Sequence, residues 1–295
     1  KRIILPICSL FLDCFFYVFL VFRVVCVVSA ICFKIIPLFI PILFYFLGIN
    51  TETTELKKLI TEKKSLVYGL TLQIIFLPLV GIAISTIFKT SIFSTAVVLA
   101  LLVPGGHVSG LLTHIKKGNI ALSVGLTSIA SLLSPFTIVL WLNIVISDSQ
   151  EININFLQTF LQLSLLVLIP FLAGIFTLIK KPEFAEKFSG RLDQFLKVVV
   201  LVLTFSGPIE IRELLADNFF EGSKLALLAL ISIYALNLLV SKALNLSSQS
   251  MRTITIEGVC QNFPILLVLS VSLNMPEVIV YGVIYYLVSM VFAVS

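Results

Sequence analysis

A single carboxylate lies deep inside a long apolar stretch near the C-terminal end of the sequence. The apolar segment 250–274 contains, in order, Glu257, Gly258, Cys260, Gln261, Asn262 and Pro264. Ionisable residues are costly inside a membrane segment, and they are functional candidates by default. Carboxylate, carboxamide and carbonyl oxygens are the ligands that hard cations prefer. The pattern therefore predicts a cation site at Glu257, in a helix that is interrupted close to it.

The apolar segment 91–114 carries a second interruption, the run 103–110 with the sequence Val-Pro-Gly-Gly-His-Val-Ser-Gly. Proline lacks an N–H group and glycine has little helical preference, so this run predicts a break in the helix. Two interrupted helices in corresponding parts of a chain are the best sequence pointer to a binding site at the middle of the membrane. Freed carbonyl groups there suit a cation, and the N-termini of the half-helices suit an anion.

Hydroxyl groups gather in a third apolar segment, 119–146. Four of them recur every three or four residues and so share one helix face: Ser123, Thr127, Ser131 and Ser134. Two interpretations remain open. Ser123 and Thr127 supply oxygen ligands to a cation, or the small side chains allow close packing between helices.

The composition indicates what kind of element must position these residues. Of the 295 residues, 59% are hydrophobic and only 12% are charged, and the mean hydropathy is +1.15. A soluble domain needs more charge to cover its surface. The apolar runs are continuous and about 20 residues long, which suits membrane-spanning helices better than the alternating strands of a barrel. We expect an all-α polytopic membrane protein.

The apolar segments predict ten transmembrane helices. They lie at about 3–32, 35–49, 65–88, 91–114, 119–146, 155–179, 192–215, 223–245, 250–274 and 276–295. We expect the first to be a span rather than a cleaved signal peptide, because it is too long for one. Ten spans divide into two inverted five-helix repeats, about 1–150 and 151–295. With a cytoplasmic N-terminus, most lysines and arginines fall in inner loops. Membrane topology thus explains the net charge of +5 without a nucleic-acid partner.

At these motifs the chain resembles the bile acid:sodium symporter family. The similarity lies in Pro104-Gly105-Gly106-x-x-Ser109, in the stretch from Lys117 to Thr127, and in Thr255-Ile256-Glu257-x-x-x-Gln261-Asn262. A further patch is Gly69-x-x-x-Gln73-x-x-x-x-Pro78. The resemblance implies two broken helices that cross in a core domain, with a panel domain against it. The core would comprise 65–146 (helices 3–5) and 222–295 (helices 8–10). The panel would comprise 1–64 (helices 1–2) and 147–221 (helices 6–7).

The resemblance also implies two sodium sites and a substrate site. The first sodium site would consist of Ser109, Ser123, Thr127 and Glu257. The second would consist of Gln73, Glu257, Gln261 and the backbone carbonyls of Gly258 and Cys260. The residues expected to contact substrate are Asn262, His107, Gly106 and Val108. One departure concerns the first site, because the family usually has asparagine where this chain has Gly110. For His107 we leave open a hydrogen bond to substrate, a proton-sensitive role, or a side chain satisfied by its neighbours.

These observations predict a sodium-coupled symporter of small organic anions that works by alternating access in the plasma (inner) membrane. The expected partners are two sodium ions, an organic anion and the lipid bilayer, without an organic cofactor or an obligate protein partner. The alternative is a proton-coupled organic anion carrier or antiporter of the same fold, with Glu257 as the proton carrier. An intramembrane enzyme is disfavoured, because the sequence contains no HExxH motif and both histidines lie in one segment. Which anion is carried stays open.

Overall fold

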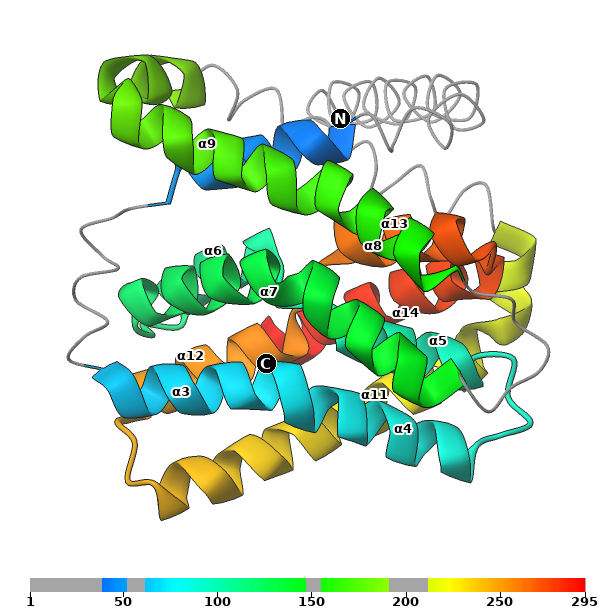
Figure 1. Cartoon of the computed structure of the whole chain (residues 1–295). Coiled ribbons are helices and arrows are strands. Elements are labelled where there is room, and N and C mark those ends of the chain that lie inside the picture. The colour runs from blue at the N-terminus through cyan, green and yellow to red at the C-terminus, as the bar shows by residue number, and fades with distance from the viewer. Residues whose placement is uncertain (1–38, 52–61, 147–154, 191–211, 295) are drawn as a thin grey trace, which may run out of the picture.

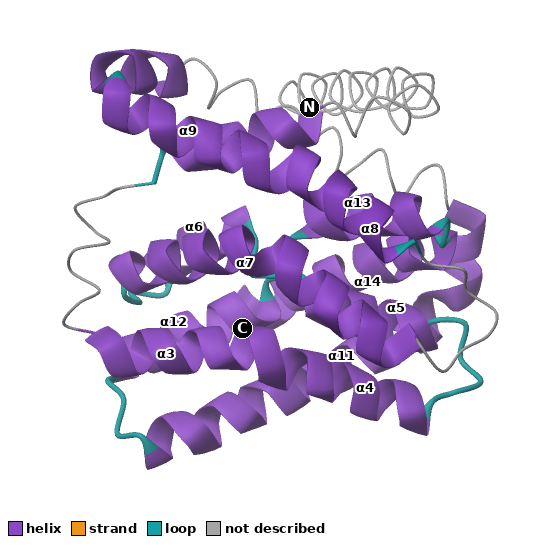
Figure 2. Ribbon diagram, viewed as in Figure 1, coloured by secondary structure: helices purple, strands orange, loops and turns teal. Residues whose placement is uncertain are grey.

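The computed structural model describes residues 39–51, 62–146, 155–190 and 212–294. Every regular element within these ranges is helical, and their only β-type pairing is one isolated bridge between Gly105 and Gln261 (Figure 2). The predicted span 3–32 and nearly all of the predicted span 192–215 lie outside the described residues. The helical class predicted from the apolar runs is therefore confirmed for the described part of the chain.

The described part of the first half contains two long helices, one shorter helix and one interrupted helix (Figure 1). After the helix Phe39–Ile49 come α3 (Lys63–Thr71), the π-helical turn η2 (Leu72–Phe76), α4 (Leu77–Ile87), α5 (Ser94–Leu102), α6 (His107–Ile115) and α7 (Ile120–Ile146). The elements α3, η2 and α4 follow each other without a gap. The predicted span 91–114 is divided into α5 and α6, as its proline and glycines indicate.

The second half repeats the combination of long and interrupted helices. It contains α8 (Phe156–Leu163), the π-helical turn η3 (Ser164–Leu168), α9 (Ile169–Lys180), the helix 182–190, α11 (Arg212–Ala243), α12 (Ser248–Val259), α13 (Phe263–Leu273) and α14 (Pro276–Val294). Over both halves, five described helices are long and apolar enough to cross a membrane. The protein is therefore a multi-pass membrane protein.

The helix α11 is longer than its apolar segment. The sequence predicts a loop at 216–222, whereas α11 runs without a break from Arg212 to Ala243. The acidic residues Glu213, Asp217 and Glu221 are four residues apart and therefore share one helix face. An apolar stretch marks only the part of a helix that lies in lipid, so α11 extends beyond the membrane-spanning part of its sequence.

The core of the described protein surrounds α5. All seven residues from Ala96 to Leu102 are buried, and α5 packs against α4, α14 and α13. A helix that is apolar on every side belongs in the interior. The outer helices instead expose large apolar side chains, among them Phe176 (63% exposed) and Val291 (73% exposed). Such a surface suits lipid rather than water.

The helix Phe39–Ile49 packs closely against α9. A Cβ atom on Gly174 would lie 2.9 Å from the Cα atom of Gly48, so neither glycine leaves room for a larger residue. The Tyr45 hydroxyl donates a hydrogen bond of 3.1 Å to the Thr177 hydroxyl across the same contact. Small residues at such a crossing allow two membrane helices to approach closely.

Candidate ion and substrate site

The two interrupted helices meet at their breaks. The Gly106 N–H donates a 2.7 Å hydrogen bond to the carbonyl of Cys260, and the Asn262 N–H donates a 2.8 Å hydrogen bond to the carbonyl of Pro104. These bonds pair the two breaks in antiparallel fashion. The backbone groups that each helix loses at its break are thus partly satisfied by the other, as a membrane interior requires. In Figure 1, α6 and α12 lie on one side of this crossing, and α5 and α13 on the other.

The glycines of the first break are required by this close approach. A Cβ atom on Gly105 would overlap the carboxylate of Glu257 and lie 3.4 Å from Nε2 of Gln73. A Cβ atom on Gly106 would lie 2.8 Å from the carbonyl oxygen of Gln261, closer than side chains normally approach. Glycine therefore lets the first break lie directly against both Glu257 and the second break.

The carboxylate of Glu257 is fully buried at this crossing. Three hydroxyl groups from two other helices surround it. The Thr127 hydroxyl donates to Oε2 at 2.9 Å, and the Ser123 hydroxyl donates to Oε1. The Ser109 hydroxyl lies 2.6 Å from Oε1 and also 2.6 Å from the Gly106 carbonyl, so its proton has two possible acceptors.

The surroundings of Glu257 are polar but carry no positive charge. Among the described residues, its side-chain neighbours are the three hydroxyls and the carboxamide of Gln73, and no lysine or arginine pairs with it. Neutral donors only partly offset the cost of burying a carboxylate. The four side chains predicted for the first sodium site thus meet at one point, where oxygen atoms face one another around an anionic group. This arrangement suits a bound cation or a proton.

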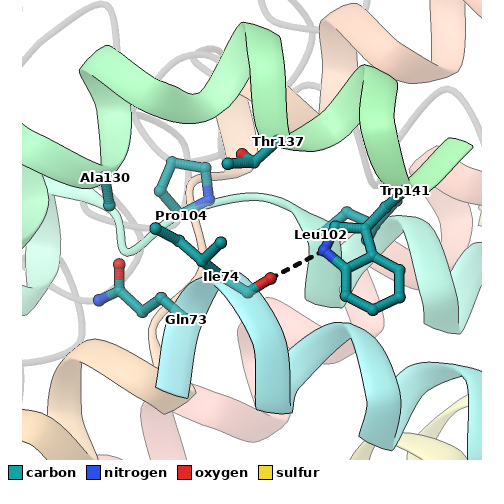
Figure 3. Close-up of a pocket in the computed structure, with 7 residues that line it drawn as sticks. All are labelled: Gln73, Ile74, Leu102, Pro104, Ala130, Thr137 and Trp141. Atoms are coloured by element: carbon teal, nitrogen blue, oxygen red, sulfur yellow. Dashed lines mark hydrogen bonds between the residues drawn. The ribbon is translucent and has the colours of Figure 1, made fainter. Parts of the chain in front are cut away.

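Gln73 reaches the crossing from the π-helical turn η2. It is buried, and neither atom of its carboxamide has a hydrogen-bond partner in the described structure. The carbonyl of Ile74, the next residue, accepts a 2.8 Å hydrogen bond from the indole N–H of Trp141 on α7 (Figure 3). This bond fixes the π turn to α7. Gln73 thereby forms one wall of a small pocket beside the first break, with Ile74, Leu102, Pro104, Ala130, Thr137 and Trp141.

The second break carries the remaining oxygen atoms predicted for a cation. The carbonyl of Gly258 accepts a 2.6 Å hydrogen bond from Nε2 of Gln261, and the carbonyl of Cys260 accepts the hydrogen bond from Gly106. The side-chain oxygen of Gln261 is buried and has no hydrogen-bond partner among the described residues. A carbonyl oxygen has two lone pairs, so the Cys260 carbonyl retains one that can face an ion while it accepts from Gly106.

The residues expected to contact substrate lie where two half-helices begin. Asn262 is the N-cap of α13, and its side-chain oxygen accepts a 3.3 Å hydrogen bond from the Ile265 N–H. Its side-chain nitrogen is buried and has no partner in the described structure. Gly106 is the N-cap of α6, which His107 and Val108 open. The structure describes the backbone of His107 but not its side chain. Two helix N-termini and one unused amide donor suit an anion at the crossing.

Sequence reasoning missed a buried asparagine that holds α12 in place. Asn237 on α11 is fully buried. Its Nδ2 atom lies 3.0 Å from the Met251 carbonyl and 2.5 Å from the Thr255 hydroxyl, while its Oδ1 accepts a hydrogen bond from Ser241. These contacts fix α12 two residues before Glu257. A lone carboxamide within the apolar run 223–245 was the available signal.

The architecture and the site together define a class of protein. Secondary transporters are built around two broken helices that cross near their breaks. This protein has such a crossing, with a buried carboxylate among oxygen atoms and helix N-termini that face the same point. Comparison with known sequences agrees with this class. Residues 37–211 match the sodium bile acid symporter family, and the chain belongs to that family. The resemblance noted in the sequence motifs is thereby confirmed.

Individual relatives are transporters by name. The chain is 27% identical to the uncharacterised sodium-dependent transporter YocS of Bacillus subtilis (strain 168), over 77% of this chain and 70% of that protein. It is 26% identical to the probable sodium/metabolite cotransporter BASS2, chloroplastic, of Oryza sativa subsp. japonica, over 72% of this chain. The matches span half of that rice protein and 34% of a second one, BASS1, which is 30% identical over 46% of this chain.

Proposed function

We propose that this protein is a sodium-coupled symporter that carries small organic anions across the membrane by alternating access. The observation that carries the proposal is the environment of Glu257, a fully buried carboxylate that meets three hydroxyls and no positive side chain among the described residues. A cation at this point offsets the cost of burying the carboxylate. The names of the family and of the relatives, which refer to sodium, support sodium as that cation.

We assign the ion-binding atoms to two sites that share Glu257. The first comprises oxygen atoms of Ser109, Ser123, Thr127 and Glu257, and the second those of Gln73, Glu257, Gln261 and the carbonyls of Gly258 and Cys260. Sodium in these sites links the two broken helices, because its ligands come from both of them and from α7. Sodium is co-transported here rather than a resident cofactor.

The substrate anion occupies the space in front of the two half-helix N-termini. The Asn262 amide donates a hydrogen bond to it, and the backbone at Gly106, His107 and Val108 provides the positive end of α6. Sodium and the anion stabilise each other, since their charges are opposite and lie close together in a poorly solvated place. This coupling is what makes transport of the anion depend on sodium.

Alternating access requires two bodies that move past each other. We propose the core as 65–146 with 222–295, and the panel as 1–64 with 147–221. The unbroken helix α11 begins in the panel range and ends in the core range, so it connects the two bodies. The close contact of the helix Phe39–Ile49 with α9 supports the panel, because it joins its two parts. The proposed protein lies in the plasma membrane with its N-terminus in the cytoplasm, on the basis of the lysine and arginine distribution.

The deciding experiment measures uptake of radiolabelled organic anions into proteoliposomes that contain the purified protein. We expect uptake of at least one small carboxylate to require an inward sodium gradient at fixed pH on both sides. Liposomes without protein provide the background. Uptake driven by a proton gradient without sodium would instead establish the proton-coupled alternative, with Glu257 as the proton carrier.

The variant Glu257→Gln tests the role of the carboxylate within the same assay. Glutamine keeps the size of the side chain and one acceptor oxygen, but it replaces the other oxygen with a donor NH2 group and removes the charge that holds the cation. We expect a loss of sodium-driven uptake of about 100-fold or more, because a close charge pair in a buried site contributes several kcal/mol. The variant should be recovered from the membrane in wild-type yield. Wild-type uptake by this variant would refute the assignment.

A further inference from the structure

Two tyrosine hydroxyls on α14 are buried without a hydrogen-bond partner in the described structure. They belong to Tyr281, which is fully buried, and Tyr285, which is 2% exposed. A buried hydroxyl that lacks a partner is costly, and in a native protein it calls for an explanation. The tyrosines are one helical turn apart, yet their surroundings differ.

Tyr285 lies at the second break. It lies close to the carboxamide of Gln261 and to the thiol of Cys260, although its hydroxyl forms no hydrogen bond with any described residue. The next residue, Tyr286, has its ring 6.2 Å from that of Phe263, the first residue of α13. Tyr281 has its ring 5.6 Å from that of Phe93 and 6.0 Å from that of Tyr285. Tyr286 also lies close to Cys260, but Tyr285 is the one of the two unpartnered tyrosines that lies close to the Gln261 carboxamide of the second sodium site.

The carboxamide of Gln261 is oriented the wrong way for a cation. Its Nε2 donates a 2.6 Å hydrogen bond to the Gly258 carbonyl, and its Oε1 has no partner in the part of the chain that the structure describes. An amide N–H and a cation compete for the same region around that carbonyl, because both carry positive charge. When a cation binds there, rotation of the carboxamide turns Oε1 towards the ion and Nε2 away from it. The displaced N–H group then needs an acceptor, and the Tyr285 hydroxyl is the neighbouring one.

We propose that Tyr285 is a positioning residue of the second sodium site, whose hydroxyl accepts the Gln261 N–H when sodium takes its place at the Gly258 carbonyl. The inference rests on the proposed function, since it concerns one of its two ion sites. It adds a contribution from α14 to ligands that otherwise come from η2 and α12. It also explains why the hydroxyl has no partner among the described residues in this structure, because the Gln261 N–H becomes its partner only when sodium is bound.

The test compares the variants Tyr285→Phe and Tyr281→Phe, each of which removes one buried hydroxyl from the same helix. Thermal unfolding of the purified proteins is followed while sodium chloride replaces potassium chloride at constant ionic strength. We expect Tyr285→Phe to need about five- to tenfold more sodium for half of the full stabilisation, the effect of one lost hydrogen bond. In potassium alone it should melt at or above the wild-type temperature, because it loses an unpartnered group. Tyr281→Phe should respond to sodium like the wild type.

Gln261→Ala provides a second, independent measurement. In that background Tyr285→Phe should cause no further change in the sodium response, since the tyrosine acts through the carboxamide. A wild-type sodium response in Tyr285→Phe, or a melting temperature in potassium well below that of the wild type, would overturn the inference in favour of a packing role. A wild-type protein that sodium stabilises no more than potassium would reject the proposed function itself, and it is recognised without any variant.

Discussion

The hydroxyls around Glu257 can serve the ion-free and the ion-bound state without moving their oxygen atoms. Each hydroxyl has one proton and two lone pairs. In the structure the protons of Ser123 and Thr127 point at the carboxylate. When a cation lies among these oxygens, rotation about the C–O bond turns a lone pair towards it and the proton towards another acceptor. The proposed first site is therefore defined by oxygen positions that α6, α7 and α12 hold in advance.

Gly110, the residue after Ser109, lies beside the proposed first site. A Cβ atom on Gly110 would have only the Ser123 hydroxyl within 4 Å, at 4.0 Å. A side chain there has room and points towards the first site. We expect Gly110→Asn to lower the sodium concentration that gives half-maximal uptake by about three- to tenfold, because the carboxamide adds an oxygen ligand.

Gly110→Ala is the matched control for this change. Alanine adds the Cβ atom without an oxygen, and it favours the helix by about 1 kcal/mol over glycine. It should raise the melting temperature and leave the sodium dependence of uptake unchanged. If both variants showed the wild-type sodium dependence, the first site would not depend on a ligand at this position.

Among the contacts between helices, the pairing of the two breaks has little room for an added side chain. In Gly106→Ala the new Cβ atom would lie 2.8 Å from the carbonyl oxygen of Gln261. The neighbouring atoms are backbone, so the breaks must separate and the hydrogen bond from Gly106 to Cys260 weakens. We expect a loss of about 2–4 kcal/mol of stability, from strain and one lost hydrogen bond. Uptake should fall with it.

The control for this variant is Gly190→Ala, in the helix 182–190. A Cβ atom there would meet no atom of the described residues within 4 Å, so the exchange should leave uptake and the melting temperature close to those of the wild type. Equal melting temperatures for the two variants would show that the breaks tolerate separation, which would contradict the close pairing in the structure.

The breaks themselves could be predicted from the sequence, because their cause is local. Proline and glycine interrupt a helix wherever they occur together, so 103–106 was expected to be non-helical, and it is. The alignment of Ser123 with Thr127 also follows from helical periodicity alone. The depth of Glu257 within its apolar segment indicated burial, which the structure confirms.

The remaining features depend on contacts between distant segments. Helical periodicity does not reveal the π turn at Leu72–Phe76, which orients Gln73 towards the crossing. The role of Asn237 appears only when α11 packs on α12. The position of Tyr285 beside the second break likewise depends on how α14 packs, and nothing in its own neighbourhood of the sequence distinguishes it from Tyr281 or Tyr286.

For the whole molecule, the contacts between the interrupted helices and the long helix α7 indicate which parts move together. The Asn119 N–H at the start of α7 donates to the Thr253 hydroxyl of α12 at 2.7 Å, and Arg252 donates to the Lys116 carbonyl at 3.0 Å. On the other side of the crossing, Trp141 joins α7 to the π turn. The long helix α7 is thus tied both to the π turn and to α12, which favours motion of the proposed core as one body.

The number of sodium ions per anion decides how the membrane potential acts on this body. Two sodium ions with one monoanion move one net positive charge, and 100 mV then contributes about 2.3 kcal/mol, or about a fiftyfold change in the accumulation ratio. One sodium ion with one monoanion moves no net charge. We predict that uptake into proteoliposomes rises with an inside-negative potassium diffusion potential set by valinomycin, at a constant sodium gradient.

Uptake of a monoanion that is independent of this potential would mean that one ion is carried. The first site, where Gly110 replaces the usual ligand, would then be empty in transport, and Gly110→Asn should make uptake respond to the potential.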